Sequence, residues 1–349
     1  MSSNGRIRIG VVGCGYWGIN YVRVFGELAD SIVTHVCDQR QERLQLAKQR
    51  FHPGPIGRGC GWKACNSVEE MLDEHKLDAV VVATPATAHY EVTKKCLEHG
   101  KHVLVEKPIT TSSSEAAELA SLAQTQNLIL MVGHTFVFNA GVRAIKRYLD
   151  SKALGNIYYL HATRTNLGPI RSDVNAIWDL APHDVSIFDY LLGGEPNWVS
   201  AVGGRVLGNC REDVGFITLG YPGGIVGNIH VSWADPNKVR EVVVVGSEMR
   251  IVFNDMDAQE RVRVFNKGVT LIPPETDGVG EFHFRLHDGD IISPWVESSE
   301  PLKNQAAHFL TCIREQTAPI SDGAFALRVV RVMEAIDHSI QQKGTPQIL

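Results

Sequence analysis

Three glycines, Gly13, Gly15 and Gly18, directly follow an apolar run over residues 7–12. In a strand–turn–helix unit this G-x-G-x-x-G spacing gives each glycine a steric purpose. The first permits a tight turn, the second lets a pyrophosphate approach the backbone, and the third lets the helix pack on the strand. The helix N-terminus then offers free N–H groups and a partial positive charge to phosphate oxygens. The spacing therefore predicts a dinucleotide-binding turn. The alternative is a plain glycine-rich turn.

A carboxylate stands twenty residues beyond the last of these glycines, where a second apolar run over residues 32–37 ends in Asp38. At this position a carboxylate accepts a hydrogen bond from the 2′-hydroxyl of an adenosine ribose. It would also repel the 2′-phosphate that distinguishes NADP from NAD. We therefore expect NAD as the cofactor, with NADP less favoured, although Arg40 offers a cation that a 2′-phosphate would attract.

Lys107 lies in the tripeptide Glu106-Lys107-Pro108, directly after an apolar run over residues 102–105. If that run is a parallel strand, the lysine stands at the carboxyl end of the sheet, beside the dinucleotide. Pro108 favours an extended backbone at Lys107. Partial burial near a positively charged nicotinamide predicts a lowered pKa for the amine, which would then stabilise negative charge on a substrate oxygen. The alternative is a solvated lysine in a loop.

A second group of ionisable residues lies in the segment WDLAPHD at residues 178–184. Asp179 and His183 are four residues apart, so a helix places them on one face. Because Pro182 is tolerated only in a first helical turn, we expect the helix to begin near residue 179. The positive helix end would then keep the His183 ring neutral and able to accept a proton. Asp179 would bind the substrate or hold the imidazole, and Asp184 would cap the helix. A capped helix start with a surface histidine is the alternative.

A polar loop over residues 164–177 precedes this segment and contains two arginines. Arginines beside a cleft bind phosphate or carboxylate groups through paired N–H donors. We therefore predict a substrate-binding loop, with a solvated surface loop as the alternative. No third ligand accompanies Asp179 and His183, so no metal site is expected. The predicted substrate-binding residues are Lys107, Arg164, Asn166, Arg171, Asn175, Asp179 and His183.

Other polar residues follow predicted strands. Thr84 and Pro85 come after the apolar run over residues 79–83, and His89 stands near the start of the next helix. They would line the cofactor site or form a plain strand-to-helix turn. His134 is a lone histidine that we expect to be structural. The predicted cofactor-binding residues are Gly13, Gly15, Tyr16, Trp17, Gly18, Asp38, Arg40, Thr84, Pro85, His89, Glu106 and Lys107.

The elements that must position these residues alternate between strand and helix over the first 132 residues. Strands are predicted at 7–12, 32–37, 79–83, 102–105 and 128–132, and helices at about 17–28, 40–50, 67–73, 87–99 and 112–126. Such alternation predicts a parallel, doubly wound sheet. We assign residues 1–132 to a Rossmann domain that binds NAD(P). The glycine-rich loop over residues 51–66 has no assigned function.

From residue 133 onward the pattern becomes richer in strands. Helices are predicted at about 139–151, 179–192, 301–316 and 324–342, and strands at 156–163, 198–206, 213–219, 224–233, 238–246, 248–253 and 260–265. This pattern predicts an α+β domain with a large, mostly antiparallel open sheet. We assign residues 133–349 to substrate binding and oligomerisation, because a second copy is the simplest cover for an open sheet face.

Composition excludes several classes of protein. The chain of 349 residues has 44% hydrophobic residues and a net charge of −5. It carries no basic block interleaved with aromatic residues, so nucleic acid is not an expected partner. No apolar run approaches the roughly 18 residues of a membrane span, and no secretory leader pattern opens the chain. The seven cysteines are scattered, as in reduced cytoplasmic proteins. We therefore expect a cytoplasmic protein.

Three segments resemble the glucose–fructose oxidoreductase, inositol dehydrogenase and rhizopine catabolism family (Gfo/Idh/MocA): VVGCGYWG at 11–18, ATPATAHYEVTKKCLEHGKHVLVEKP at 83–108 and WDLAPHD at 178–184. Weaker similarity runs through residues 321–339. The resemblance implies a Rossmann domain, a second domain whose open sheet makes dimer or tetramer contacts, and nicotinamide-dependent oxidation or reduction of a sugar or cyclitol. It also implies that Lys107, Asp179 and His183 are the catalytic residues.

Within the family, the loop RTNLGPIRSDVN at residues 164–175 and the WDLAPHD segment look most like those of bacterial nucleotide-sugar 3-dehydrogenases. We therefore expect hydride transfer between NAD and a secondary alcohol of a nucleotide-linked or phosphorylated sugar. In the oxidation direction His183 accepts the hydroxyl proton, Lys107 stabilises the alkoxide, and Asp179 orients the substrate or the imidazole. A cyclitol or free-sugar dehydrogenase is the first alternative. A sensor that binds NAD and a sugar without turnover is the second, and a reductase of a non-sugar substrate such as an imine is the third.

Overall fold

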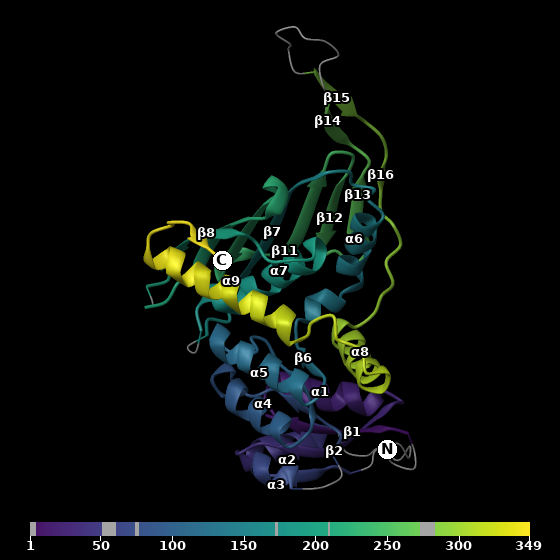
Figure 1. Cartoon of the computed structure of the whole chain (residues 1–349), viewed down its shortest axis with the longest axis vertical. Helices are drawn as coiled ribbons and strands as arrows, with labels where there is room; N and C mark the ends of the chain where they lie inside the picture. Colours follow the sequence, from purple (N-terminus) through teal and green to yellow (C-terminus); the bar gives the residue numbers. More distant parts are fainter. Residues whose placement is uncertain (1–4, 51–60, 74–76, 172–173, 209, 273–282) are drawn as a thin grey trace. The chain divides into compact units, whose positions relative to one another are not determined.

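The computed structural model describes residues 5–50, 61–73, 77–171, 174–208, 210–272 and 283–349 (Figure 1). The chain forms two compact units. The first contains Met1–Phe138 and Ser299–Val330, and the second contains Asn139–Ser298 and Arg331–Leu349. The chain therefore enters each unit twice. The predicted domains divide the sequence once, after residue 132. They therefore place Ser299–Val330, the segment that returns to the first unit, in the second domain.

A six-stranded parallel sheet in the order β3-β2-β1-β4-β5-β6 organises the first unit. Its strands are β1 (Ile7–Val12), β2 (Ser31–Cys37), β3 (Lys63–Cys65), β4 (Ala79–Val82), β5 (His102–Val105) and β6 (Leu130–Val132). Its helices are α1 (Tyr16–Glu27), α2 (Gln41–Arg50), α3 (Val68–Leu72), η1 (Ala86–Ala88), α4 (His89–Glu98), α5 (Ser113–Thr125) and η2 (Thr135–Phe138). The strand order reverses between β1 and β4, and ligands bind doubly wound sheets at such a point.

This sheet confirms the predicted doubly wound fold, with one correction. The loop predicted over residues 51–66 contains strand β3, which pairs in parallel with β2. Three residues are too few to show a periodic pattern, so only the pairing with β2 reveals the strand. Residues 51–60 of the predicted loop lie outside the described residues.

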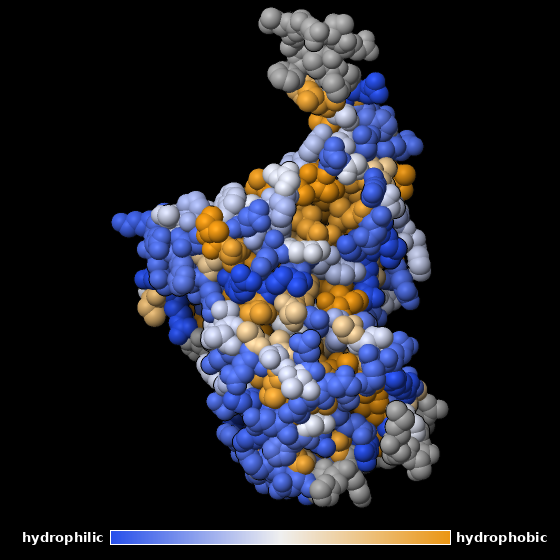
Figure 2. Space-filling model, viewed as in Figure 1, coloured by the Kyte–Doolittle hydropathy of each residue, from blue (hydrophilic) through white to orange (hydrophobic). Residues whose placement is uncertain are grey.

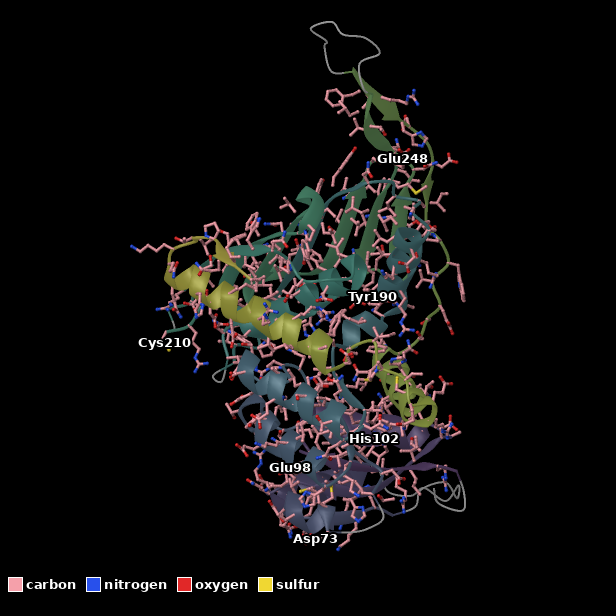
Figure 3. The ribbon with its side chains drawn as sticks, in the orientation of Figure 1. Asp73, Glu98, His102, Tyr190, Cys210 and Glu248 are labelled. Atoms are coloured by element: carbon pink, nitrogen blue, oxygen red, sulfur yellow. The ribbon has the colours of Figure 1, made fainter. Side chains whose placement is uncertain are left out.

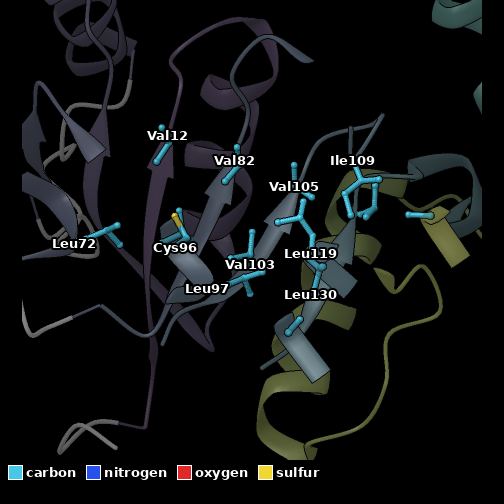
Figure 4. Packing of buried hydrophobic residues seen from close by; sticks show 14 of the residues in the cluster. Val12, Leu72, Val82, Cys96, Leu97, Val103, Val105, Ile109, Leu119 and Leu130 are labelled. Carbon is cyan, nitrogen blue, oxygen red and sulfur yellow. The ribbon is translucent and has the colours of Figure 1, made fainter. Parts of the chain in front are cut away.

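Apolar side chains pack between this sheet and its helices (Figure 4). Val82, Val103 and Val105 of the strands meet Leu97 of α4 and Leu119 of α5 in one buried cluster. The strands are buried on both faces, which explains their continuous apolar sequences.

The returning segment completes the first unit with α8 (Pro301–Glu315) and the beginning of α9 (Gly323–Gln341). Helix α8 packs on α1, where Phe309 meets Phe25 edge to face with ring centroids 6.5 Å apart. The backbone N–H of Val132, at the end of β6, donates to the carbonyl of Ser321 over 2.8 Å. Both contacts join residues that are far apart in the sequence.

A nine-stranded sheet in the order β16-β13-β12-β11-β7-β10-β9-β8-β17 organises the second unit. Its strands are β7 (Ile157–Leu167), β8 (Trp198–Gly204), β9 (Val214–Gly220), β10 (Val226–Ser232), β11 (Ala234–Gly246), β12 (Arg250–Asn254), β13 (Val262–Phe265), β16 (Ile291–Ile292) and β17 (Gln347–Ile348). Only β7 and β10 pair in parallel among these described strands. The predicted, mostly antiparallel sheet is therefore confirmed.

Helices α6 (Ala140–Asp150) and α7 (Ala176–Leu192) pack on one face of this sheet. Glycines permit the close approach of α7: a Cβ atom on Gly215 would lie 2.7 Å from Ile177, and one on Gly227 would lie 3.0 Å from Phe188. Neighbouring residues in each strand point the other way. Phe216 therefore lies on the face opposite α7, where its ring stacks on His230.

Four large apolar side chains on that opposite face are exposed: Tyr159, Val202, Phe216 and Val226. Strand register links them, because Phe216 pairs with Val202 and Val226 pairs with Tyr159. Apolar residues also gather over the second unit near its projecting hairpin, among many charged ones (Figure 2).

That hairpin consists of β14 (Gly268–Ile272) and β15 (His283–His287) and extends from the edge of the sheet (Figure 1). The hydroxyl of Tyr158 donates to the carbonyl of Val269 over 2.6 Å and ties the hairpin to β7. The sequence did not predict this element, since the β-rich pattern was assigned only as far as residue 265. Residues 273–282 lie outside the described residues.

Candidate active site

The glycine-rich turn connects β1 to α1, as predicted. Gly13 has a φ of 92°, which a residue with a side chain rarely adopts. A Cβ atom on it would lie 2.6 Å from the carbonyl oxygen of Ala83, the residue after β4. A Cβ atom on Gly18 would lie only 1.7 Å from the carbonyl oxygen of Gly13. The first and third glycines are therefore sterically required by the turn and by the packing of α1.

Gly15 differs, because a Cβ atom there would meet no atom within 4 Å. It precedes the first residue of α1, and neither a side-chain cap nor an acidic residue occupies the first helical turn. The N–H groups of this turn are thus accessible to phosphate oxygens, and a methyl group at Gly15 would intrude on the same space. The turn fits the pyrophosphate of a dinucleotide. Tyr16 and Trp17, which follow, have exposed side chains.

Asp38 is held against this turn. One carboxylate oxygen, Oδ2, accepts the N–H of Cys14 over 2.7 Å, and the other, Oδ1, accepts the N–H of Arg40 over 2.9 Å. The Arg40 guanidinium is much more exposed, with its Nε 3.8 Å from the carboxylate. The carboxylate is therefore oriented by the backbone and still has lone pairs for a ribose hydroxyl.

His89 is buried and joins two loops at the carboxyl edge of the sheet. Its Nδ1 lies 2.6 Å from the carbonyl oxygen of Pro108, and its Nε2 lies 2.9 Å from that of Thr84. Burial lowers the pKa of the ring, so a neutral His89 donates to one carbonyl at a time. The structure thus gives His89 the task of holding the residues around Thr84 and Lys107. Its role in cofactor binding, and that of Pro85, stay predictions.

Lys107 is the second residue after β5 and is partly exposed, and its bond to Pro108 is a cis peptide bond. Glu106 before it is buried. His134 is also buried, with its ring edge to face against Phe325, which supports the structural role expected for it. Burial, with a smaller contribution from the Lys107 charge, lowers the pKa of His134 to about 3. His134 therefore stays neutral beside Lys107.

In the second unit, helix α7 begins three residues earlier than predicted. Asn175 caps it, because its side-chain oxygen accepts the N–H of Trp178 over 2.8 Å. Pro182 therefore lies inside the helix, and the expectation that it marks the first turn was wrong. His183 lies beyond that turn too. Since the helix dipole acts mainly on the terminal turn, it does not explain a neutral His183.

Asp179 and His183 nevertheless share one helix, which places them on the same face as predicted. Asp179 accepts a hydrogen bond from Nη1 of Arg171 over 2.9 Å. Arg171 is exposed, so its guanidinium also faces solvent. The side chain of Asn166 donates to the carbonyl of Gly168, and that of Asn175 donates to Glu212.

Arg164 and Asp184 have other roles than those predicted. The polar loop does not start at residue 164, since β7 continues to Leu167. Arg164 is buried, and its Nε and Nη2 each donate to a carboxylate oxygen of Asp184 over 2.8 Å. Asp184 therefore ties α7 to β7 instead of capping the start of the helix, where Asn175 is the cap. This paired, buried arginine has little surface left for a substrate.

The structure divides the predicted site residues between its two units. The predicted cofactor residues and Lys107 lie in the first unit, around the carboxyl edge of the parallel sheet. Asp179, His183 and the residues of the polar loop lie in the second. Sequence reasoning missed Tyr21, whose hydroxyl donates to Glu106, and Gln305, which donates to the Tyr21 hydroxyl. No sequence signal connects residues so far apart.

Two further findings bear on function. No group of three or more metal-binding side chains is found among the described residues. No helix in the described ranges is long and apolar enough to cross a membrane.

The turn geometry predicts that Gly15→Ala loses cofactor affinity and keeps its stability. The new methyl group meets no protein atom, so the free energy of unfolding should change by less than about 0.5 kcal/mol. The Kd for NAD, measured by calorimetry, should rise roughly tenfold or more, since the methyl group would meet the pyrophosphate. Gly26→Ala, at the other end of α1 and also without a neighbouring atom, is the matched control. An unchanged Kd in Gly15→Ala would contradict the assignment of this turn.

The burial of His134 predicts a loss of stability in acid. Its pKa is about 6.5 when unfolded and about 3 when folded, so below pH 6.5 only the unfolded chain takes up the proton. Between pH 7 and pH 5 this costs about 2 kcal/mol of unfolding free energy. Denaturant unfolding should be measured at pH 7 and at pH 5. The fall in unfolding free energy between these two pH values should be smaller in His134→Asn than in the unmodified protein. Equal losses would mean that His134 does not titrate in this way.

Two protein-family models match the chain. A model described as "Oxidoreductase family, NAD-binding Rossmann fold" matches residues 7–134, and one for the "GFO/IDH/MocA C-terminal domain" matches residues 142–252. The chain is 26% identical over 332 residues to the UDP-N-acetylglucosamine 3-dehydrogenase of Acidithiobacillus ferrooxidans, covering 93% of this chain and 94% of that protein. It is 28% identical to the scyllo-inositol 2-dehydrogenase (NAD(+)) of Bacillus subtilis, over 72% of each chain.

Other matches are partial or more distant. An uncharacterized oxidoreductase of Streptococcus pneumoniae is 27% identical, but the match spans only 54% of that protein. The WlbA dehydrogenase of Bordetella pertussis, solved with NADH and UDP-GlcNAcA, has the same fold, with a TM-score of 0.76, 21% identity and 99% of each chain covered. With both domain models matched over most of its length, the chain belongs to the Gfo/Idh/MocA family of NAD-binding oxidoreductases.

Proposed function

We propose that this oxidoreductase transfers a hydride between NAD and a secondary alcohol of a nucleotide-linked or phosphorylated sugar, as a 3-dehydrogenase does. The proposal rests on two groups of ionisable residues, each observed within its own unit. Lys107 stands at the carboxyl end of β5, and Asp179 and His183 stand on one face of α7. The relative from Acidithiobacillus ferrooxidans, matched over nearly the whole chain, is named for a nucleotide sugar.

Each residue has a task that its chemistry allows. NAD, when bound, would supply a hydride acceptor at C4 of its nicotinamide. In the oxidation direction His183 takes the hydroxyl proton, and the Lys107 ammonium stabilises the alkoxide that forms. Asp179 orients the substrate or the His183 ring. Exposed Arg171, hydrogen-bonded to Asp179, would bind a phosphate of the substrate and bring that anion close to the reacting groups.

Asp38 supports the preference for NAD over NADP. Its carboxylate is fixed by the N–H groups of Cys14 and Arg40, so it cannot easily turn away from a 2′-phosphate. Exposed Arg40 is the residue that would relax this preference.

The test measures turnover with NAD or NADP and a panel of nucleotide sugars, sugar phosphates, cyclitols and free sugars, followed by the absorbance of reduced nicotinamide. We expect turnover of a nucleotide or phosphorylated sugar with NAD. Lys107→Met and His183→Ala should each lower kcat/KM by roughly 100- to 10,000-fold. His99→Ala, at an exposed histidine, is the control.

The pH–rate profiles of these two variants distinguish which residue is the base, because removing the base abolishes the limb that it governs. Near-normal turnover in both variants would refute the assignment. Binding of NAD and sugar without turnover would favour the sensor. Turnover of inositols alone would favour a cyclitol dehydrogenase, toward which the relative from Bacillus subtilis points.

We also propose that the protein self-associates through the face of the large sheet opposite α7. Tyr159, Val202, Phe216 and Val226 form the exposed apolar surface on that face. Light scattering should show a dimer or tetramer, and Phe216→Arg should shift it to smaller species because it would bury a charge. Thr111→Arg, on the first unit, should have no effect. A monomer at micromolar concentration would refute this part of the proposal.

A further inference from the structure

The buried carboxylate of Glu106 lies against the backbone of Lys107. Glu106 accepts two hydrogen bonds: its Oε2 accepts the backbone N–H of Lys107 over 3.2 Å, and its Oε1 accepts the hydroxyl of Tyr21 over 2.6 Å. The carboxylate is buried, with 6% of the residue's surface exposed. Burying a charge is costly unless hydrogen bonds and an opposite charge compensate it. Glu106 therefore needs its partners.

A further chain of hydrogen bonds fixes the Tyr21 hydroxyl. Gln305 of α8 donates from Nε2 to the Tyr21 oxygen over 2.8 Å, and Thr135 donates to Oε1 of Gln305 over 2.9 Å. Tyr21 has a single hydroxyl proton. Since its oxygen accepts from Gln305, that proton points to Glu106. Both carboxylate oxygens thus act as acceptors, the arrangement that an ionised carboxylate prefers.

Charge couples Glu106 to Lys107. Burial raises the pKa of Glu106 above its ordinary value, and the Tyr21 hydrogen bond and the Lys107 charge offset only part of this rise. Because Coulomb attraction is mutual, an ionised Glu106 would favour the charged form of Lys107. Two histidines also interact with Lys107, His89 on α4 and His134 after β6, and burial lowers the pKa of both. Both are therefore neutral at neutral pH and add no positive charge beside Lys107.

We propose that Glu106 is a positioning residue: held by Tyr21 and Gln305, its carboxylate fixes the backbone of Lys107 and keeps the Lys107 amine protonated. The consequence for catalysis rests on the proposed function, in which a charged Lys107 stabilises an alkoxide. The coupling of the two side chains does not rest on it. Through Tyr21 and Gln305, helices α1 and α8 also take part in placing the amine.

The test measures the pKa of Lys107 in the full chain without cofactor or substrate. Trace labelling with acetic anhydride across a pH series, read by mass spectrometry of the Lys107 peptide, reports this pKa directly. In Glu106→Gln it should fall by about one unit or more, because the compensating anion is gone. Glu98→Gln removes an exposed carboxylate at the end of α4 (Figure 3) and should leave it unchanged.

Tyr21→Phe is the second variant, because it removes one donor to Glu106 and retains the ring that stacks on Phe25. It should lower the Lys107 pKa by a smaller amount in the same direction. An unchanged pKa in folded Glu106→Gln overturns the proposal. If that variant does not fold, an unchanged pKa in Tyr21→Phe overturns it instead.

Failure of the proposed function is seen separately. If no sugar is turned over with NAD but the labelling shift occurs, the coupling stands and the substrate assignment falls. If turnover occurs, the limb of the pH–rate profile that depends on Lys107 should move to lower pH in Glu106→Gln, which a merely structural residue would not cause.

Discussion

The close packing of the glycine-rich turn against its neighbours is the constraint on which the first unit depends. Helix α1 approaches β1 so closely that Gly18 nearly touches the carbonyl of Gly13, and Gly13 in turn lies against Ala83. This packing places the N-terminus of α1 at the carboxyl edge of the sheet. It also brings Cys14 against Asp38, so a hydrogen bond joins the turn proposed to bind phosphate to the carboxylate proposed to bind ribose. A larger residue at either glycine would disturb both at once.

Buried polar contacts fix the remaining parts of the site. His89 holds the segment after β4 to the segment after β5, and Glu106 holds the backbone of Lys107 to α1. In the second unit, Arg164 and Asp184 hold α7 on the sheet. Breaking such a buried pair by removing one partner leaves an uncompensated charge, which is strongly destabilising. These contacts therefore position the backbone of Lys107 and helix α7, which carry the side chains proposed to react.

Several corrections have a common physical origin. Pro182 by itself predicts a helix start, but Asn175 caps the helix earlier and the helix accommodates the proline. The sequence predicts that Arg164 binds an anion of the substrate, but the strand extends past it and its Nε and Nη2 donate to Asp184 on the facing helix. A prediction from a sequence pattern uses only a residue and its neighbours along the chain. In these cases the partner across the fold decided the outcome.

The amino-acid sequence alone determined the features that depend on local sterics and periodicity. They are the glycine turn, the alternation of strand and helix around it, the carboxylate at Asp38 and the shared helix face of Asp179 and His183. Only the tertiary structure decided the return of α8 to the first unit, the three-residue strand β3, and the partners of Arg164 and Glu106. Each of these joins residues distant in the sequence. Their energy comes from burial and pairing across the fold, which no spacing along the chain records.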